Sequence, residues 1–253
     1  MLLLVLISVK CMVFAMSMAN LTIGSVNCRG LAFDEIKRRD IFHKCKKLYD
    51  ITFLIDTHCL KEKEKQWKTE WGYSAFFAFL NSTSRGVAIM FKNSFQYTLH
   101  SETRDPKGNF IILDVSTQEQ RLSLVALYGP NEDSPDFFEN LKIKLVALSN
   151  TSIIIGGDWN VVQDFSFDTD NYLHKSNLKS HDKVLEISSY LDLIDVWRKI
   201  YTEERRFTWH GPNRKQSRLD YFHISSDLEG FIKRSEIGLS YRSFPSVCLI
   251  PIS

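Results

Sequence analysis

The stretch Ser152-Ile153-Ile154-Ile155-Gly156-Gly157-Asp158-Trp159-Asn160 decides the fold class of this chain. Its three isoleucines predict a buried strand, because β-branched side chains favour a pleated, packed surface. The two glycines that follow let the backbone approach a neighbouring group closely. Asp158 and Asn160 then stand at the carboxyl end of the strand, which is where α/β sheets bind ligands. The stretch therefore predicts an acid and an amide placed to orient a water, a metal ion or a phosphate oxygen.

Composition favours a single large α/β domain. The chain has 253 residues, of which 44% are hydrophobic, and this is enough apolar material for one extensive core. A net charge of +2 falls short of the basic balance that identifies a nucleic-acid-binding protein by itself, and it does not exclude a polyanionic substrate. The five cysteines are scattered and form no CxxC pair, which indicates a reduced intracellular chain rather than a disulfide framework or a zinc module.

Residues 1–20 form an apolar segment that Lys10 interrupts. The segment is too short and too broken to predict a membrane span, so no stable membrane partner is expected. It is similar to a signal peptide in its apolar stretch and its small residues, but it has no basic region before them. Two interpretations remain: an extension of an intracellular protein of the nucleus or cytoplasm, or a secretion signal. The domain itself is expected over residues 21–253.

The periodicity predicts interleaved strands and helices. Helices are expected at 35–48, 135–148 and 184–193, with Asp34 capping the first and Ile36, Phe42, Cys45 and Leu48 near helical spacing. The charged segment 61–70 is expected to be a solvated helix or loop. Strands are expected at 21–26, 51–55, 87–91, 110–115, 122–127, 153–155, 219–224 and 236–239. Because several strands follow one another without a helix, we expect mixed sheets with helices outside.

Polar side chains recur at the ends of these expected strands. They are Asn27, Asp56, His58, Tyr128, Asn131, Asp158, Asn160 and Asp220. Each has a structural interpretation of its own: Asp56 could be a turn residue, the Asp158 and Asn160 pair could build a tight turn, and Asp220 could form a salt bridge with Arg218. Together they would make an oxygen-rich cleft, and Mg²⁺ needs only one or two carboxylates because it keeps several waters.

Several other activities lack their motifs. The chain has no GxxxxGK[ST] phosphate loop, no GxGxxG dinucleotide fingerprint and no GxSxG nucleophile elbow. A small-molecule cofactor is therefore not expected. The basic residues within 37–39 and 44–47 fall on an expected helix, where they indicate a solvated face rather than a DNA clamp.

A set of short motifs in a fixed order resembles a known family. The set is Asn27-Cys28-Arg29-Gly30, Asp56-Thr57-His58, Ser84-Arg85-Gly86-Val87-Ala88, Tyr128-Gly129-Pro130-Asn131, Gly157-Asp158-Trp159-Asn160 and Ser217-Arg218-Leu219-Asp220-Tyr221. It resembles the endonuclease/exonuclease/phosphatase superfamily, which includes the apurinic endonucleases. Within it, residues 191–198 and 207–209 make the chain most similar to the endonuclease domain of non-LTR (LINE-type) retrotransposons. The similarity extends over about residues 21–243.

The resemblance implies a fold, a metal ion and a substrate. The implied fold is a four-layer α/β sandwich in which two mixed sheets pack face to face with helices outside. The implied activity is Mg²⁺-dependent phosphodiester hydrolysis of DNA, with Mn²⁺ as a possible substitute ion, and the protein would contact the phosphate backbone. By position, Asn27 and Asp56 would help to hold the metal ion.

The resemblance also assigns the remaining site residues. Tyr128 would lie against the scissile phosphate, Asp158 would activate the water, and Asn160 would orient the phosphate. Asp220 would brace a histidine that contacts the phosphate. The oligomeric state stays open.

Two departures from the family pattern affect the expected activity. The acid before Thr-His is Asp56 where the family has Glu, and Phe244 and Pro245 stand where the family has the Asp and His of its terminal Ser-Asp-His. Neither Phe244 nor Pro245 can ligate a metal ion or donate a hydrogen bond from its side chain. We therefore expect a domain that is altered or truncated at its C-terminal end, with weak or absent nuclease activity. The alternatives are a catalytically inactive nucleic-acid-binding remnant, or a secreted nuclease or lipid phosphatase of the same superfamily.

Overall fold

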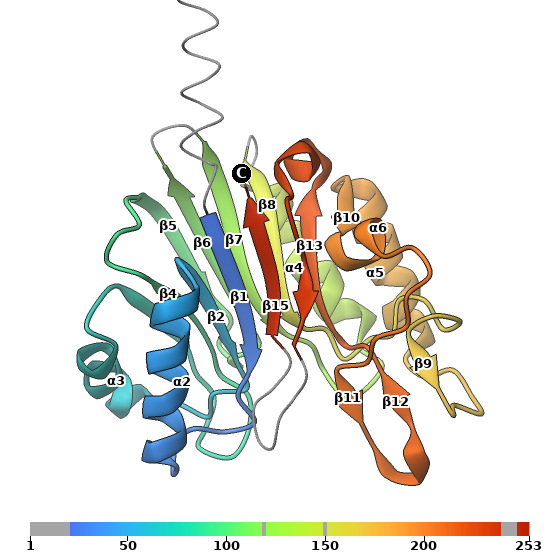
Figure 1. Ribbon diagram of the computed structural model, residues 1–253, viewed down its shortest axis with the longest axis horizontal. Coiled ribbons are helices and arrows are strands. Elements are labelled where there is room, and N and C mark those ends of the chain that lie inside the picture. The colour runs from blue at the N-terminus through green and yellow to red at the C-terminus, as the bar shows by residue number, and fades with distance from the viewer. Residues whose placement is uncertain (1–20, 118–119, 149–150, 239–246, 253) are drawn as a thin grey trace, which may run out of the picture.

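The computed structural model describes residues 21–117, 120–148, 151–238 and 247–252. Two six-stranded sheets pack face to face with helices on their outer surfaces, which confirms the expected four-layer sandwich (Figure 1). The predictions for residues 1–20 and for Phe244 and Pro245 lie outside the described residues. Within the described residues, no helix is long and apolar enough to cross a membrane.

The first sheet has the strand order β14-β15-β1-β2-β4-β3. Its strands are β1 (Leu21–Asn27), β2 (Ile51–Ile55), β3 (Ala75–Ala78), β4 (Val87–Phe91), β14 (Glu236–Ile237) and β15 (Val247–Ile252). β1 and β2 are parallel, whereas β15 pairs antiparallel with β1, so the sheet is mixed as expected. Helices α2 (Glu35–Leu48) and α3 (Glu64–Trp71) cover its outer face, and a short 3₁₀ turn, Lys61–Lys63, precedes α3.

The second sheet has the strand order β10-β13-β8-β7-β6-β5. Its strands are β5 (Thr98–Arg104), β6 (Phe110–Ser116), β7 (Arg121–Tyr128), β8 (Ser152–Asp158), β10 (Leu193–Asp195) and β13 (Asp220–Ser225). Helices α4 (Pro135–Val146) and α5 (Leu178–Tyr190) pack outside it, and α6 (Val196–Ile200) follows β10. A third, small sheet joins β9 (Thr169–Asp170), β11 (Trp209–His210) and β12 (Gln216–Ser217).

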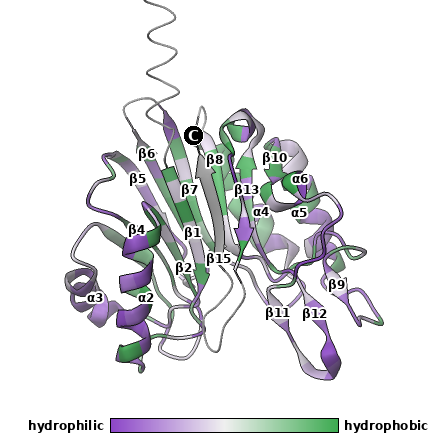
Figure 2. Cartoon of the chain, viewed as in Figure 1, coloured by the Kyte–Doolittle hydropathy of each residue, from purple (hydrophilic) through white to green (hydrophobic). Residues whose placement is uncertain are grey.

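The core lies in three apolar layers. The central layer joins the inner faces of the two sheets, where Phe53 of β2 contacts Phe222 of β13. One outer layer fills the space under α2 and α3, and the other fills the space under α4 and α5. In Figure 2 the central strands of the two large sheets, such as β7 and β8, are largely hydrophobic, whereas most of α2 is hydrophilic. Nearly continuous apolar strands such as Ile51–Ile55 are therefore buried on both faces.

Three expectations about the helices were wrong in part. Of the four apolar residues near helical spacing in α2, Phe42 and Cys45 are buried, whereas Ile36 and Leu48 are exposed and Arg38 and Ile41 face the sheet in their place. The segment at 61–70 is not simply solvated, since α3 buries Trp67 and Trp71 against Phe42. The helix expected at 184–193 begins earlier, at Leu178, and ends at Tyr190, because residues 193–195 pair as a strand with β13.

Candidate active site

A polar cleft of about 200 Å³ opens where the strands of both sheets end. All six residues predicted as site residues line it: Asn27, Asp56, Tyr128, Asp158, Asn160 and Asp220. The cleft also receives Arg29, Asn131, Thr208, Trp209 and His210. Larger hollows, of about 740 Å³ over α3, about 660 Å³ beside α4 and about 350 Å³ beside Thr151, contain none of the six. The structure thus brings together side chains that are far apart in the sequence.

Strand register places three of these side chains next to one another. Asp158 ends β8, opposite Tyr128 in the parallel strand β7 and opposite Asp220 in the antiparallel strand β13. Directly opposed residues in neighbouring strands point to the same face and lie about 5 Å apart. A slip of one residue in either pairing would turn Asp158 away from its neighbours, so the register of the sheet fixes this part of the site.

The turn after β8 depends on glycines. A Cβ on Gly157 would lie 2.0 Å from the Leu127 carbonyl oxygen, and one on Gly129 would lie 2.0 Å from the Trp159 carbonyl oxygen. Asn160 has a φ of 52° and donates from Nδ2 to the Gly129 carbonyl, while its N–H donates to Asp158 Oδ1. The turn interpretation of Asp158 and Asn160 is therefore correct as far as it goes, since one oxygen of Asp158 helps to build the turn.

Asn27 and Asp220 leave buried oxygens without partners. Asn27 donates from Nδ2 to Asp158 Oδ2 at 2.8 Å, and its own Oδ1 accepts no hydrogen bond from any described residue. Asp220 Oδ1 is likewise buried and without a partner among the described residues. Buried polar atoms in native proteins are nearly always satisfied, so each unpaired oxygen marks a position for a ligand, an ion or a water.

The two neighbouring carboxyl groups share an unfavourable electrostatic environment. Burial raises the pKa of Asp158 well above its usual range, and the adjacent charges of Asp220 and Asp56 raise it further. Burial also raises the pKa of Asp220 to about 6, although hydrogen bonds from Thr208 and Asn27 and the charge of Arg29 oppose that shift. Two close carboxyl groups that resist ionisation are typical of functional sites, because a cation or a proton relieves their repulsion.

Asp56 is held at the rim by a strained backbone. Its φ is 55°, and the φ values of His58 and Arg85 are also positive. Asp56 Oδ1 accepts hydrogen bonds from the Arg85 N–H and interacts with His58 Nε2, both at 3.0 Å. Left-handed conformations of residues other than glycine cost about 1 kcal/mol or more, and they concentrate at functional sites. These contacts use Oδ1 and leave Oδ2 of Asp56 for a ligand.

Tyr128 keeps its proton at neutral pH. Burial raises its pKa to about 12, and the negative charges of Asp56 and Asp158 act in the same direction. A phenol that stays neutral beside carboxylates remains a hydrogen-bond donor. Tyr128 is therefore suited to donate to an anionic oxygen in the cleft.

The donor set fits Mg²⁺ better than a transition metal. No group of three His, Cys, Asp or Glu side chains among the described residues is close enough to hold a metal ion by itself. A magnesium site does not need such a group, because Mg²⁺ retains several waters and takes one or two carboxylates. The unpaired amide oxygen of Asn27 and the carboxylate of Asp56 are hard oxygen ligands on the same cleft. The residues present therefore fit the implied ion.

Several cleft residues were not predicted as site residues. Arg29 was quoted only as part of a motif, His210 was not singled out, and Thr208 and Trp209 served only to support the resemblance. Thr208 Oγ1 accepts hydrogen bonds from the backbone N–H groups of Leu219 and Asp220. Arg29 could have been predicted as a cleft residue, because it stands only two residues after Asn27. His210 reaches the cleft from β11, a two-residue strand that periodicity does not reveal.

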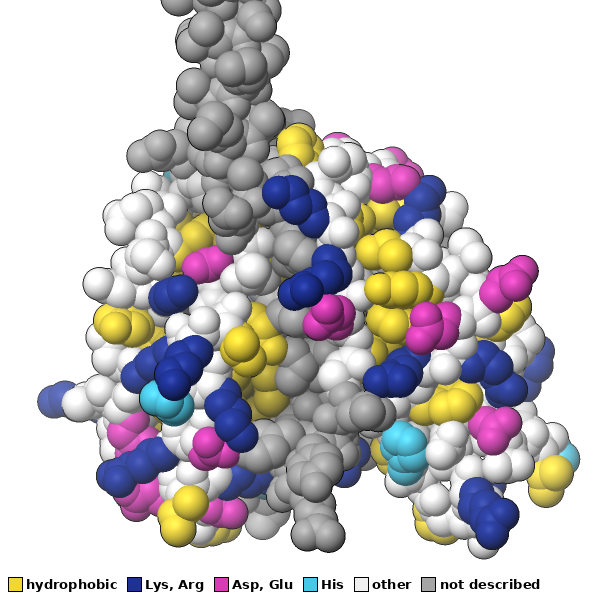
Figure 3. All heavy atoms as spheres, viewed as in Figure 1, with side chains coloured by type: hydrophobic (Ala, Val, Ile, Leu, Met, Phe, Trp, Pro, Cys, Tyr) yellow, Lys and Arg dark blue, Asp and Glu magenta, His cyan; other side chains and the backbone are white. Residues whose placement is uncertain are grey.

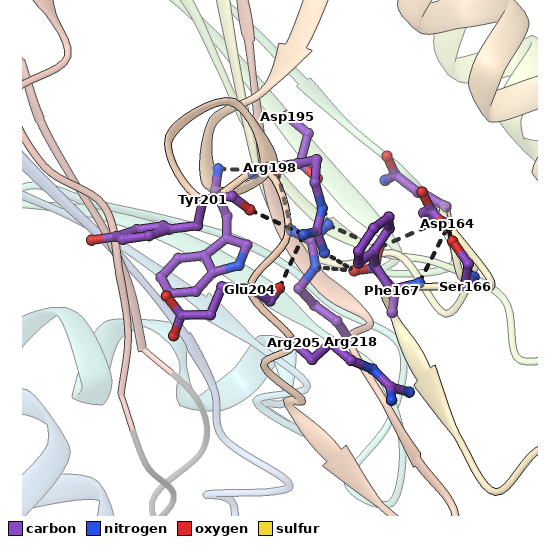
Figure 4. Close-up of polar contacts among 12 residues, drawn as sticks. Asp164, Ser166, Phe167, Asp195, Arg198, Tyr201, Glu204, Arg205 and Arg218 are labelled. Atoms are coloured by element: carbon purple, nitrogen blue, oxygen red, sulfur yellow. Dashed lines mark hydrogen bonds and ion pairs between the residues drawn. The ribbon is translucent and has the colours of Figure 1, made fainter.

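Arg218 does not pair with Asp220. Its guanidinium instead binds Asp168 at 2.8 and 2.9 Å and Asp195 at 2.6 and 3.1 Å, and Arg198 also binds Asp168 (Figure 4). Tyr221 donates from its hydroxyl to the Arg218 carbonyl. The salt bridge considered for Asp220 from the sequence was therefore wrong, and Asp220 stays free to face the cleft.

The fold is that of the apurinic/apyrimidinic (AP) endonucleases. An AP endonuclease from Leishmania major has a TM-score of 0.75 and 16% sequence identity, covering 91% of this chain and 86% of that one. The catalytic domain of Xenopus laevis APE2 has a TM-score of 0.75 and 17% identity, covering 92% and 91%. A 3′ phosphatase from Neisseria, NExo, bound to a product DNA hairpin, has a TM-score of 0.69 and 16% identity, covering 92% and 99%.

Sequence similarity adds a mobile-element relative. The chain is 32% identical over 198 residues, which is 76% of its length, to the "Transposon TX1 uncharacterized 149 kDa protein" of Xenopus laevis. It spans 15% of the length of that relative. No family model matches the chain. The expected resemblance therefore holds at two levels: the fold is that of the AP endonucleases, and the sequence is similar to that of a transposon protein.

Proposed function

We propose that this chain is a divalent-metal-dependent phosphodiesterase derived from a retroelement endonuclease, whose natural reaction is to nick DNA and leave a 3′-hydroxyl. The observation that carries the proposal is the convergence of Asn27, Asp56, Tyr128, Asp158, Asn160 and Asp220 on one cleft of an AP-endonuclease fold. The natural site of action is intracellular DNA, in the nucleus or the cytoplasm.

The cleft residues supply distinct parts of the reaction. Asp158 accepts the proton of the attacking water, and its raised pKa makes its carboxylate a stronger base than that of an ordinary aspartate. Tyr128 and Asn160 donate hydrogen bonds to phosphate oxygens, since Asn160 Nδ2 has a second hydrogen beyond the one given to Gly129. Asn27 and Asp56 would hold Mg²⁺, which, when bound, stabilises negative charge on the phosphoryl group.

We further propose that this copy is impaired. Asp220 Oδ1 has no partner among the described residues, and the family histidine that it would brace is replaced by Pro245. Losing a hydrogen-bond donor to the transition state commonly costs about 100-fold in rate. The chain is therefore expected to nick DNA about 100-fold more slowly than the same chain with Asp and His restored at positions 244 and 245.

The test is a nicking assay on supercoiled plasmid with Mg²⁺. It compares the unmodified chain, the double variant Phe244→Asp/Pro245→His, and each of these with Asp158→Asn as a matched inactive control. The double variant should nick about 100-fold faster than the parent, and Asp158→Asn or EDTA should abolish nicking. Equal rates for parent and double variant would disprove the impairment, and nicking that survives both Asp158→Asn and EDTA would disprove the proposed chemistry.

A second function is favoured by the same replacement. If the double variant remains inactive but the chain retains DNA, the domain acts as a nucleic-acid-binding remnant. Retention should then weaken as salt rises, because contacts to phosphate release counterions. Filter binding across 50 to 200 mM salt, combined with the nicking assay, distinguishes the two functions: retention without nicking identifies the remnant, and no retention at any salt concentration excludes it.

A further inference from the structure

Arg29 brings positive charge into an otherwise acidic cleft. Asp56, Asp158 and Asp220 line the cleft, and among the described residues of the lining only Arg29 is always cationic, with His210 as the other basic side chain. A net negative cleft would repel a phosphodiester, and a divalent ion offsets only two of the three carboxylates. The charge of Arg29 therefore matters to any anion that enters.

The backbone around Arg29 is fixed in an uncommon conformation. Arg29 has a φ of 47° and Gly30 a φ of 79°, and a Cβ on Gly30 would lie 2.7 Å from His58 Nδ1. The Gly30 N–H donates to the Asp56 carbonyl, and Lys37 Nζ donates to the Arg29 and Gly30 carbonyls. A left-handed arginine is costly, and these contacts hold it in place. The loop thus fixes the backbone that carries Arg29 at the rim of the cleft.

The guanidinium of Arg29 has no hydrogen bond or ion pair with any described residue, whereas Arg38, Arg121 and Arg218 each bind a carboxylate. Arg29 is nevertheless close enough to lower the pKa of both Asp158 and Asp220 through its charge. An arginine that lies beside two carboxylates without bonding either one keeps its donors available. A guanidinium presents paired N–H groups in the geometry that matches phosphate oxygens.

We propose that Arg29 binds a non-bridging oxygen of the phosphodiester and offsets the charge that develops on it. This inference rests on the proposed function, and it adds to that function a phosphate-binding residue supplied by the loop after β1. Arg29 and the metal ion then act on the same phosphate, and Arg29 repels the ion when no phosphate is present.

The first test measures nicking by Arg29→Gln and Arg29→Lys in the Phe244→Asp/Pro245→His background. Arg29→Gln should lower kcat/KM about 100-fold, and Arg29→Lys about 10-fold because an ammonium lacks the paired donors. Arg39→Gln is the matched control: it removes the same charge from an exposed i,i+4 pair with Glu35 outside the cleft, and it should change kcat/KM less than twofold. Equal kcat/KM for Arg29→Gln and Arg39→Gln would overturn the inference.

The second test measures the binding of Mn²⁺ to the protein in the absence of DNA, by electron paramagnetic resonance. Removing a positive charge beside the carboxylates should tighten Mn²⁺ binding about fivefold in Arg29→Gln and leave it unchanged in Arg39→Gln. Slower nicking together with tighter ion binding cannot result from misfolding, which would weaken both. Weaker or unchanged Mn²⁺ binding in Arg29→Gln would also overturn the inference.

The third test applies whether or not the chain nicks DNA. In EDTA, Arg29→Gln should bind a short duplex about 10-fold more weakly than the parent, with a salt slope smaller by about one charge. If the parent binds but Arg29→Gln binds equally well, the inference fails and the proposed function stands. If the parent neither binds nor nicks DNA, the proposed function fails and the inference fails with it.

Discussion

Two clusters of aspartate and arginine side chains meet at the segment 218–220. Arg218 belongs to one cluster and Asp220 to the other, and the clusters differ in how their charges are paired. Around Arg218, both neighbouring aspartates are bound, so each buried charge has a partner (Figure 4). In the cleft, Asp158 and Asp220 face each other, Asn27 Oδ1 and Asp220 Oδ1 have no partner among the described residues, and Arg29 binds neither carboxylate.

The difference separates structural charge from charge that is available to a ligand. A buried ion pair whose hydrogen bonds are satisfied fixes local geometry. Here Arg218 links Asp195, at the end of β10, to Asp168 in a separate segment. Unsatisfied buried oxygens cost free energy unless something binds them. Surface charge shows no such contrast, because Lys and Arg are interspersed with Asp and Glu on the face drawn in Figure 3.

The largest expected effect comes from breaking the paired cluster. Arg218→Met leaves Asp168 and Asp195 buried without their main partner, and such a loss costs about 4 kcal/mol in the free energy of unfolding. Urea unfolding followed by tryptophan fluorescence measures this change. Arg39→Met, which removes an exposed pair with Glu35, is the control and should leave the midpoint unchanged. A loss below about 1 kcal/mol for Arg218→Met would remove the distinction between the clusters.

The next effect is a pH dependence from His223, which packs on Trp159 between the two clusters. Burial lowers its pKa to about 4, and the charge of Arg218 adds to this while Asp195 opposes it. As pH falls, the unfolded chain binds a proton at His223 before the folded chain does. The contribution of neutral His223 to the free energy of unfolding is therefore complete above pH 6.5 and is lost as pH falls toward 4, by about 3 kcal/mol in all. His223→Gln should remove this loss, as measured by urea unfolding in EDTA between pH 4 and 8.

The smallest effect has the opposite sign and comes from Asp220. Its folded pKa of about 6 is raised, so the folded chain holds the proton longer and stability falls as pH rises from about 4 to 6. Asp220→Asn should therefore gain about 3 kcal/mol relative to the parent at pH 7.5 in EDTA and nothing at pH 4. An equal gain at both pH values would show that hydrogen bonding rather than charge repulsion is responsible.

Local sequence signals were sufficient for much of the fold. The strands at Ile51–Ile55 and Val87–Phe91 have the bounds that their apolar runs predict, and α2 begins after Asp34, whose side chain accepts from the Lys37 N–H. The inward face of α2 was not predictable, because the Arg38 ion pair with Glu70 is a contact across 32 residues. The strand Thr98–Arg104 was missed because it is a largely exposed, polar edge strand.

The site residues that lie at the ends of regular strands could be predicted from the sequence. Asn27, Tyr128 and Asp158 lie at the carboxyl ends of their strands, where ligands bind. Asp220 begins β13 and joins them because β13 pairs antiparallel with β8, opposite Asp158. Arg29 and His210 enter the cleft from a left-handed loop and from a two-residue strand. Their positions depend on φ values and on long-range pairing, neither of which a run of residue types reveals.

The position of β15 in the first sheet affects how the chain folds during translation. This strand lies between β14 and β1, so that Leu21 is paired with Ile252. At about 10 residues per second, roughly 20 s pass on the ribosome between synthesis of these two partners. Until Ile252 leaves the exit tunnel, one edge of the strand that ends in Asn27 has no neighbour. A chaperone that shields an open sheet edge during translation is therefore expected to raise the yield of soluble protein.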